Sequence, residues 1–156
     1  MALLDAIVTV LLSLCLIVSS VHGKTTKVTY CDKKGNYDVK VGGVEITPNP
    51  VAKGKPATFS ISATAGEKIT GGKAIIDVSY YGLHVHSETH DLCAEVSCPI
   101  SSGDFLLTHS QVLPEYTPPG SYTLKMKMID ENHLLLTCFV FQFRIGFGSK
   151  TDVASS

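Results

Sequence analysis

The chain has 156 residues, of which 44% are hydrophobic and 17% are charged, and its formal net charge is -1. This composition is too apolar for a disordered chain, and it lacks the basic excess with which nucleic-acid-binding domains contact phosphates. The length suits one compact domain with a single hydrophobic core, and we predict no nucleic-acid partner.

The N-terminal segment predicts export from the cytosol. Residues 6–18 are dominated by Ala, Ile, Val and Leu, and small residues follow them. The run is shorter than the ~20 residues that span a bilayer, and it has the outline of a signal peptide, although Asp5 departs from the usual basic start. We therefore expect residues 1–23 to be removed by cleavage near Gly23, with Ser20 as the other candidate. The mature chain would be secreted or reside in a vacuolar or endosomal lumen.

The rest of the chain reads as short strands that are separated by clusters of Gly, Pro, Asn and Asp. This regular spacing is typical of an all-β sandwich. The alternation of inward and outward residues changes phase at Gly42-Gly43 and at Gly82, which predicts a β-bulge at each place. Residues 149–156 are expected to form a flexible tail. In chain order, the predicted strands are 27–31, 38–47, 57–65, 74–86, 105–113, 121–130 and 134–147.

Alternation gives these strands one apolar face each. In 121–130, for example, Leu124, Met126 and Met128 share a face, whereas Lys125 and Lys127 point the other way. Such faces form either a packed core or the wall of a ligand cavity, and the pattern does not separate the two. Unbranched methionines beside a row of phenylalanines suit an adaptable cavity lining.

Four cysteines remain once residues 1–23 are set aside, namely Cys31, Cys93, Cys98 and Cys138. In an oxidising compartment an even number predicts two disulfides, for which three pairings are possible. Proximity in the chain favours Cys93 with Cys98, which leaves Cys31 with Cys138. The C-x-x-x-x-C spacing lacks the paired C-x-x-C of zinc ribbons, so we predict no zinc site built from cysteines.

Histidines gather in one stretch of the sequence. His84 and His86, two residues apart on one predicted strand, would face the same side, and Glu88, His90 and Asp91 follow. Such residues would allow a metal-binding face. The longer segment 74–124 contains four histidines and no Lys or Arg, so its charge could also change between pH ~5 and ~7. A solvated strand edge is the simpler interpretation, and we predict no metal site and no cofactor.

Motifs of enzymes are missing from the sequence. It contains no G-x-S-x-G elbow, no H-E-x-x-H, no P-loop and no G-x-G-x-x-G. Serine and histidine residues are present, but no sequence setting marks one of them as a nucleophile. We therefore predict a binding protein and not an enzyme.

Several short motifs occur along the chain in a fixed order, namely Cys31-Asp32, Ile46-Thr47-Pro48, the bracket that ends in Cys98-Pro99-Ile100, Leu113-Pro114 and the loop 116–119. This order of cysteines, prolines and strands resembles the ML (MD-2-related lipid-recognition) family, and the short four-cysteine form is similar to the plant branch. The resemblance implies an immunoglobulin-like β-sandwich over residues 24–148, with two antiparallel sheets, an internal apolar cavity and the disulfides Cys31–Cys138 and Cys93–Cys98.

The resemblance also implies lipid binding and transfer, with a sterol or phospholipid held between the sheets. The alternative is a lipid-sensing protein that docks a membrane or a receptor partner without acting as a carrier, and either protein is expected to be a monomer. The candidate cavity wall consists of Phe59, Ile61, Ile76, Val78, Tyr80, Leu124, Met126, Phe139, Phe141 and Phe143. The candidate rim consists of Leu83, Val85, Tyr116, Pro118 and Pro119.

Overall fold

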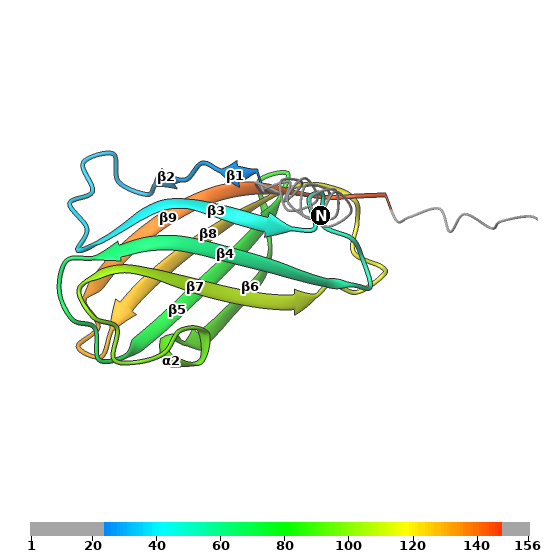
Figure 1. Cartoon of the computed structure of the whole chain (residues 1–156). Coiled ribbons are helices and arrows are strands. Elements are labelled where there is room, and N and C mark those ends of the chain that lie inside the picture. Colours follow the sequence, from blue (N-terminus) through cyan, green and yellow to red (C-terminus); the bar gives the residue numbers. More distant parts are fainter. Residues whose placement is uncertain (1–23, 148–156) are drawn as a thin grey trace, which may run out of the picture.

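The computed structural model describes residues 24–147, which form two antiparallel sheets packed face to face (Figure 1). The predicted signal peptide (1–23) and the predicted tail (149–156) lie outside the described residues. The four-stranded sheet has the order β1 (Thr25–Thr26), β3 (Val39–Thr47), β4 (Pro56–Ala65) and β7 (Gly103–Val112). The five-stranded sheet has the order β2 (Thr29–Tyr30), β9 (Leu135–Ile145), β8 (Gly120–Asp130), β5 (Gly72–Tyr80) and β6 (Leu83–Asp91).

Alternating apolar residues form the core between the two sheets. On β8, Leu124, Met126 and Met128 are buried, while the residues between them are more exposed. On β9, the side chains of Phe139 and Phe141 are buried beside them, and Met126 pairs with Phe139 across the two strands. Complete burial of such a side chain stabilises the fold by about 1.5–3 kcal/mol, so the apolar residues determine which face of each strand points into the core.

The sandwich has one closed edge and one bridged edge. At the first, β3 contacts β9 across the two sheets. At the other, β7 and β6 are the outermost strands of their sheets, and the short helix α2 (Leu92–Glu95) contacts β5, β6 and β7. Figure 1 shows α2 beside β5 and β7. Leu92 anchors it because its side chain is fully buried. In the described part of the chain, no helix is long and apolar enough to cross a membrane.

Both disulfides implied by the family resemblance are present. Cys31, just after β2, is bonded to Cys138 on β9, with their Cα atoms 5.4 Å apart. Cys93 in α2 is bonded to Cys98, with their Cα atoms 5.3 Å apart. The first bond therefore ties the start of the domain to its last strand, and the second closes a short loop at the bridged edge.

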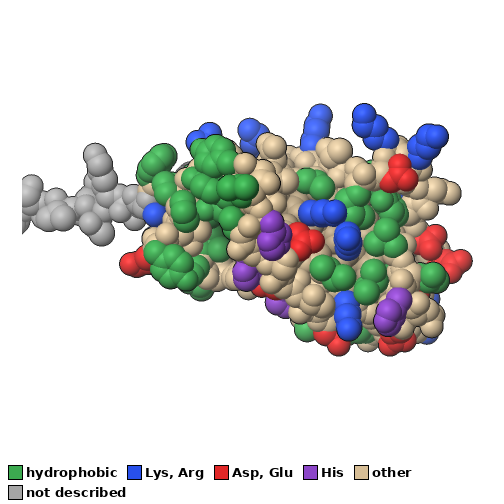
Figure 2. All heavy atoms as spheres, turned by 180° about the vertical axis from the view of Figure 1, so that it is seen from behind, with side chains coloured by type: hydrophobic (Ala, Val, Ile, Leu, Met, Phe, Trp, Pro, Cys, Tyr) green, Lys and Arg blue, Asp and Glu red, His purple; other side chains and the backbone are tan. Residues whose placement is uncertain are grey.

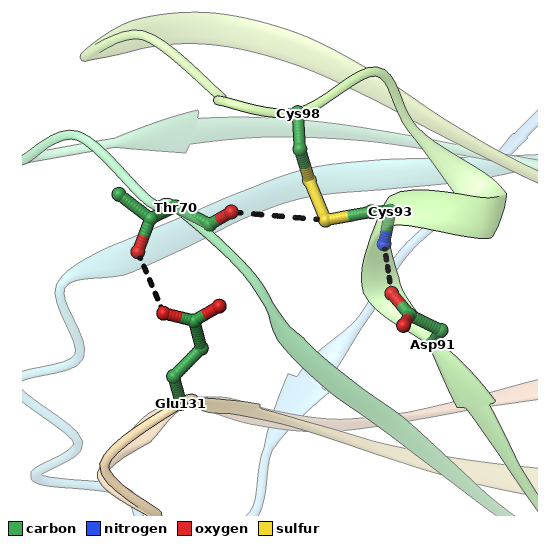
Figure 3. The surroundings of a disulfide bond; sticks show 5 residues. All are labelled: Thr70, Asp91, Cys93, Cys98 and Glu131. Atoms are coloured by element: carbon green, nitrogen blue, oxygen red, sulfur yellow. Dashed lines mark hydrogen bonds between the residues drawn. A yellow bond between two sulfur atoms is a disulfide. The ribbon is translucent and has the colours of Figure 1, made fainter.

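The Cys93–Cys98 bond sits in a small polar network (Figure 3). Asp91 is the N-cap of α2, and its Oδ1 accepts a hydrogen bond from the backbone N–H of Cys93 at 2.8 Å. Sγ of Cys93 contacts the carbonyl oxygen of Thr70 at 3.8 Å. The hydroxyl of Thr70 in turn donates to Glu131 at 3.1 Å. These contacts hold the α2 loop against the loops before β5 and after β8.

The predicted single strand 74–86 is wrong. The structure divides it into β5 and β6, which are joined by the two-residue turn Tyr81-Gly82. Both turn residues have positive φ, 48° and 80°, as in the tight turns whose twist suits a hairpin. The bulge predicted at Gly82 is therefore a turn. The bulge predicted at Gly42-Gly43 is confirmed, because the register shifts between Val41 and Gly43.

Smaller differences concern the ends of the chain. The predicted strand 27–31 is replaced by two short strands, β1 and β2, which pair with different sheets. The last strand ends at Ile145, two residues before the predicted boundary. The segment changes sheet between β1 and β2, so one continuous strand cannot form there.

Candidate functional site

A cavity of about 410 Å³ lies between the sheets. This volume falls within the ~300–1,000 Å³ typical of small-molecule sites. Its walls come from β4, β5, β6, β7, β8 and β9, and from the connection between β7 and β8. The lining consists of Phe59, Ile76, Val78, Tyr80, Val85, His86, Glu88, His109, Gln111, Leu113, Pro114, Tyr116, Thr117, Pro118, Tyr122, Leu124, Phe143 and Ile145. Most of these side chains are apolar, so the cavity suits a hydrophobic ligand.

The predicted wall divides into cavity and core. Phe59, Ile76, Val78, Tyr80, Leu124 and Phe143 line the cavity. Ile61, Met126, Phe139 and Phe141 are outside the lining and are buried in the packed core. All ten positions belong to inward faces, as alternation predicts. Alternation does not show where along a strand the two sheets separate, so it could not divide the ten into wall and core.

The predicted rim divides in the same way. Val85, Tyr116 and Pro118 line the cavity, whereas Leu83 and Pro119 do not. Leu83 is exposed immediately after the Tyr81-Gly82 turn. The carbonyl oxygen of Pro119 accepts a hydrogen bond from the hydroxyl of Tyr80 at 3.0 Å. Pro119 therefore fixes the position of the rim without lining the cavity.

Two tyrosines hold the connection between β7 and β8 over the cavity. The Tyr80 and Tyr122 rings lie 4.6 Å apart, and the Tyr122 hydroxyl donates to the carbonyl of Pro118 at 2.7 Å. Burial raises the pKa of Tyr122, and neighbouring Tyr80 raises it further, so this hydroxyl stays protonated as a donor. The loop that Tyr122 holds was not predictable from strand periodicity.

Exposed hydrophobic side chains surround this end of the cavity. We call Tyr81, Leu83, Val85 and Tyr116 the mouth patch, and their exposed fractions are 77%, 72%, 52% and 87%. Figure 2 shows hydrophobic side chains gathered at one end of the molecule, while lysine and arginine side chains are prominent along one of its long sides. Groups of exposed apolar side chains are typical of protein or membrane contact sites.

The prediction that His84 and His86 share a face is wrong. Val78 pairs with His86 but Ser79 pairs with His84, so the strand register shifts by one residue at Val85. His86 consequently lines the cavity. His84 hydrogen-bonds to Ser87 at 2.7 Å on the opposite face of the sheet. A bulge on an edge strand separates two side chains that a regular strand would align.

A polar group of side chains lies at the bridged edge. We call Glu88, His90, Glu95 and His109 the edge cluster; they come from β6, α2 and β7. Oε1 of Glu88 lies 3.3 Å from Nε2 of His90 and 3.4 Å from Nε2 of His109. Nδ1 of His109 donates to Oε1 of Glu95 at 3.1 Å. The cluster thus connects the outermost strands of the two sheets.

Charge within the cluster favours an ionised Glu88. Burial raises its pKa, but contacts with His86 and His90 and electrostatic attraction to His90 and His109 outweigh burial and lower that pKa overall. Glu88 and His109 also belong to the cavity lining, so this charge stands at the cavity wall. The sequence did not place His109 beside Glu88 and His90, because it belongs to a strand distant from them along the chain.

The similarities to known families and proteins agree with a cavity that suits a hydrophobic ligand. The family model described as "ML domain" matches residues 25–145. A putative phosphatidylglycerol/phosphatidylinositol transfer protein of Dictyostelium discoideum is 32% identical over 117 residues, which cover 72% of this chain and 81% of that protein. A phosphatidylglycerol/phosphatidylinositol transfer protein of Aspergillus oryzae is 31% identical over 115 residues, which cover 70% of this chain and 66% of that protein.

Two solved structures share the fold. A Niemann-Pick type C2 protein from the Japanese carpenter ant superposes with a TM-score of 0.52 at 15% identity, covering 80% of this chain and 92% of that protein. Chicken MD-1, solved in complex with lipid IVa, also has a TM-score of 0.52 at 15% identity, and the match covers 75% of this chain and 87% of that protein. At this identity the similarity concerns the two-sheet architecture alone.

Proposed function

Because the chain belongs to the ML-domain family, we propose that it binds a lipid between its two sheets and transfers that lipid between membranes. The observation that carries the proposal is a largely apolar cavity inside the sandwich, with exposed hydrophobic residues beside it. A lipid tail would occupy the space among Phe59, Leu124 and Phe143. Enclosing about 350 Å² of a tail at ~25 cal/mol per Å² is worth about 9 kcal/mol before entropic costs.

We propose a phospholipid as the ligand, with a sterol as the other candidate. The two relatives above are named as phosphatidylglycerol/phosphatidylinositol transfer proteins, and MD-1 was solved with lipid IVa. These names favour an acyl chain in the cavity and a polar head group at its mouth. They also favour a carrier over a lipid sensor that depends on a receptor for its output.

The mouth patch provides a route for loading. Exposed tyrosine, leucine and valine side chains prefer the interface of a membrane to water. A monomer that touches a membrane with this patch would bring the cavity close to the lipid without a partner protein. Two disulfides suit an oxidising compartment, so we place the carrier in the secretory pathway, outside the cell or in a vacuolar or endosomal lumen. It acts by binding and not by catalysis.

Transfer of fluorescent phosphatidylglycerol or phosphatidylinositol between two vesicle populations tests this proposal. We expect the protein alone to accelerate transfer, and Tyr116→Ser in the mouth patch to slow it. Leu106 is the matched control because it is also an exposed hydrophobic residue but lies outside the mouth patch, on β7. Leu106→Ser should transfer lipid at the wild-type rate. Stable lipid binding without any transfer would instead support the lipid-sensing alternative.

A further inference from the structure

We propose that Glu88, His90 and His109 bind a divalent transition-metal ion, zinc by preference, at the bridged edge of the sandwich. One ligand atom from each of these three side chains lies within 4.8 Å of the others. Two imidazoles and one carboxylate form a common zinc ligand set, in which water or another group completes the coordination. The proposal departs from our sequence-based expectation of no metal site, which considered only the residues of one predicted strand and those that follow it.

The distances within the edge cluster fit a tetrahedral ion. Zinc bonds of about 2.0–2.1 Å separate neighbouring ligand atoms by about 3.3–3.4 Å. Oε1 of Glu88 lies 3.3 Å from Nε2 of His90 and 3.4 Å from Nε2 of His109. A small shift of the His90 and His109 rings, whose centroids are 4.9 Å apart, would bring both nitrogen atoms onto one ion.

The unused nitrogen of His90 supports the same conclusion. Nε2 of His90 is buried and has no hydrogen-bond partner, although Oε1 of Glu88 is close to it. Ligand atoms around an ion direct their lone pairs at the ion and not at one another. Short separations without hydrogen-bond geometry are therefore expected of a ligand set, and they are costly for a buried nitrogen that nothing else satisfies.

A second carboxylate orients the histidines. Nδ1 of His109 donates to Oε1 of Glu95 at 3.1 Å, and Nδ1 of His90 lies 3.6 Å from the same oxygen. Histidine ligands usually donate their other N–H to a carboxylate in this way, which leaves Nε2 free to bind the metal. Glu88 is held as well, because its Oε2 accepts a hydrogen bond from His86 at 3.3 Å.

Oxygen atoms also crowd the proposed metal-binding nitrogen of His109. Nε2 of His109 lies 3.4 Å from Oε1 of Glu88 and 3.4 Å from Oε1 of Gln111, while its Nδ1 side faces Glu95. A metal ion at Nε2 would face oxygen atoms that can share its positive charge. Charged inward residues on edge strands also discourage aggregation, but that role does not require three ligand atoms to converge.

The ion would connect the two sheets beside the lipid. Glu88 and His90 belong to β6, whereas His109 belongs to β7, so the bound ion would bridge two sheets that share no ladder at this edge. Glu88 and His109 also line the cavity, so an open coordination position would lie near the cavity wall. We therefore expect zinc to stabilise the folded protein.

Native mass spectrometry and calorimetric titration with Zn²⁺ at neutral pH test the proposal, after treatment of the oxidised protein with a chelator. We expect one saturable zinc ion per chain and a higher melting temperature with zinc. His109→Ala and the isosteric Glu88→Gln should each lower the affinity at least ~100-fold, and Glu95→Gln should lower it about 10–100-fold. Tetrahedral Co²⁺ absorption should appear in the wild type and disappear in Glu88→Gln.

His84→Ala is the matched control, because His84 is 60% exposed on the opposite face and should not affect zinc binding. Circular dichroism of each variant verifies folding, and Glu88→Gln preserves the shape of the side chain if His109→Ala misfolds. No saturable binding to the wild type, or binding that Glu88→Gln and His109→Ala retain, would overturn the proposal. Lipid adducts appear in the same spectra, so failure of the metal site is distinguishable from failure of the lipid carrier.

Discussion

Filling the cavity from its β5 wall should weaken lipid binding while the fold persists. Val78 is half-buried on the inner side of β5, where it pairs with Leu124 on β8 and His86 on β6, and all three line the cavity. In Val78→Phe the added ring would enter the cavity and not the packed core. We therefore expect it to lower the free energy of unfolding by less than ~1 kcal/mol, below the ~1–3 kcal/mol typical of overpacking.

The size of the effect on binding follows from the apolar contact area between lipid and cavity wall that is lost. A phenylalanine ring in the cavity would displace lipid from on the order of 100 Å² of wall, which at ~25 cal/mol per Å² costs about 2.5 kcal/mol. Since ~1.4 kcal/mol is a tenfold change, the dissociation constant should rise about 60-fold. Val78→Ala is the counterpart, because it enlarges the cavity and should change the affinity only slightly.

Displacement of a fluorescent phospholipid, titrated against each variant, measures this difference. Thermal melting and circular dichroism establish that both variants are folded. A folded Val78→Phe protein that binds lipid with wild-type affinity would refute the reasoning, because the lipid would then not occupy the space that Val78 faces.

Two further predictions concern the stability of the fold. Loss of the Cys31–Cys138 bond, which spans 107 positions, should cost about 4.8 kcal/mol, whereas loss of Cys93–Cys98, which spans five, should cost about 2.1 kcal/mol. Thermal denaturation of the two double-alanine variants compares them, and equal losses would contradict the chain-entropy account. Phe139→Ala should lower the free energy of unfolding by ~3–5 kcal/mol, since Phe139 is fully buried. Urea denaturation measures that change, and a loss below ~1 kcal/mol would show that the side chain is not in the core.

Much of the fold follows from the sequence, because the alternation of buried and exposed residues along a strand and the preferences of turn residues depend only on neighbouring positions. The apolar face of β8 and the bulge at Gly42-Gly43 are examples. The Tyr81-Gly82 turn was missed because tyrosine favours strands, and its positive φ is stabilised by the hairpin around it. Where strand pairing determines the backbone, local preference gives the wrong answer.

The site was less predictable than the fold. The inward direction of Phe59 and Ile61 followed from alternation, yet only Phe59 lines the cavity, since the separation of the sheets varies along β4. The edge cluster depends on the pairing of distant segments, because Glu88 and His109 come from different sheets. No spacing of residues along the chain indicates that Glu88 and His109 lie close together.

Native mass spectrometry of the oxidised protein, recovered from the medium of a secreting host and incubated with mixed phospholipids and sterols, tests the central claim most directly. A folded protein that carries one lipid per chain, with phosphatidylglycerol or phosphatidylinositol retained in preference to sterol, is the predicted result. A folded protein that shows no lipid adduct under any condition would contradict the account.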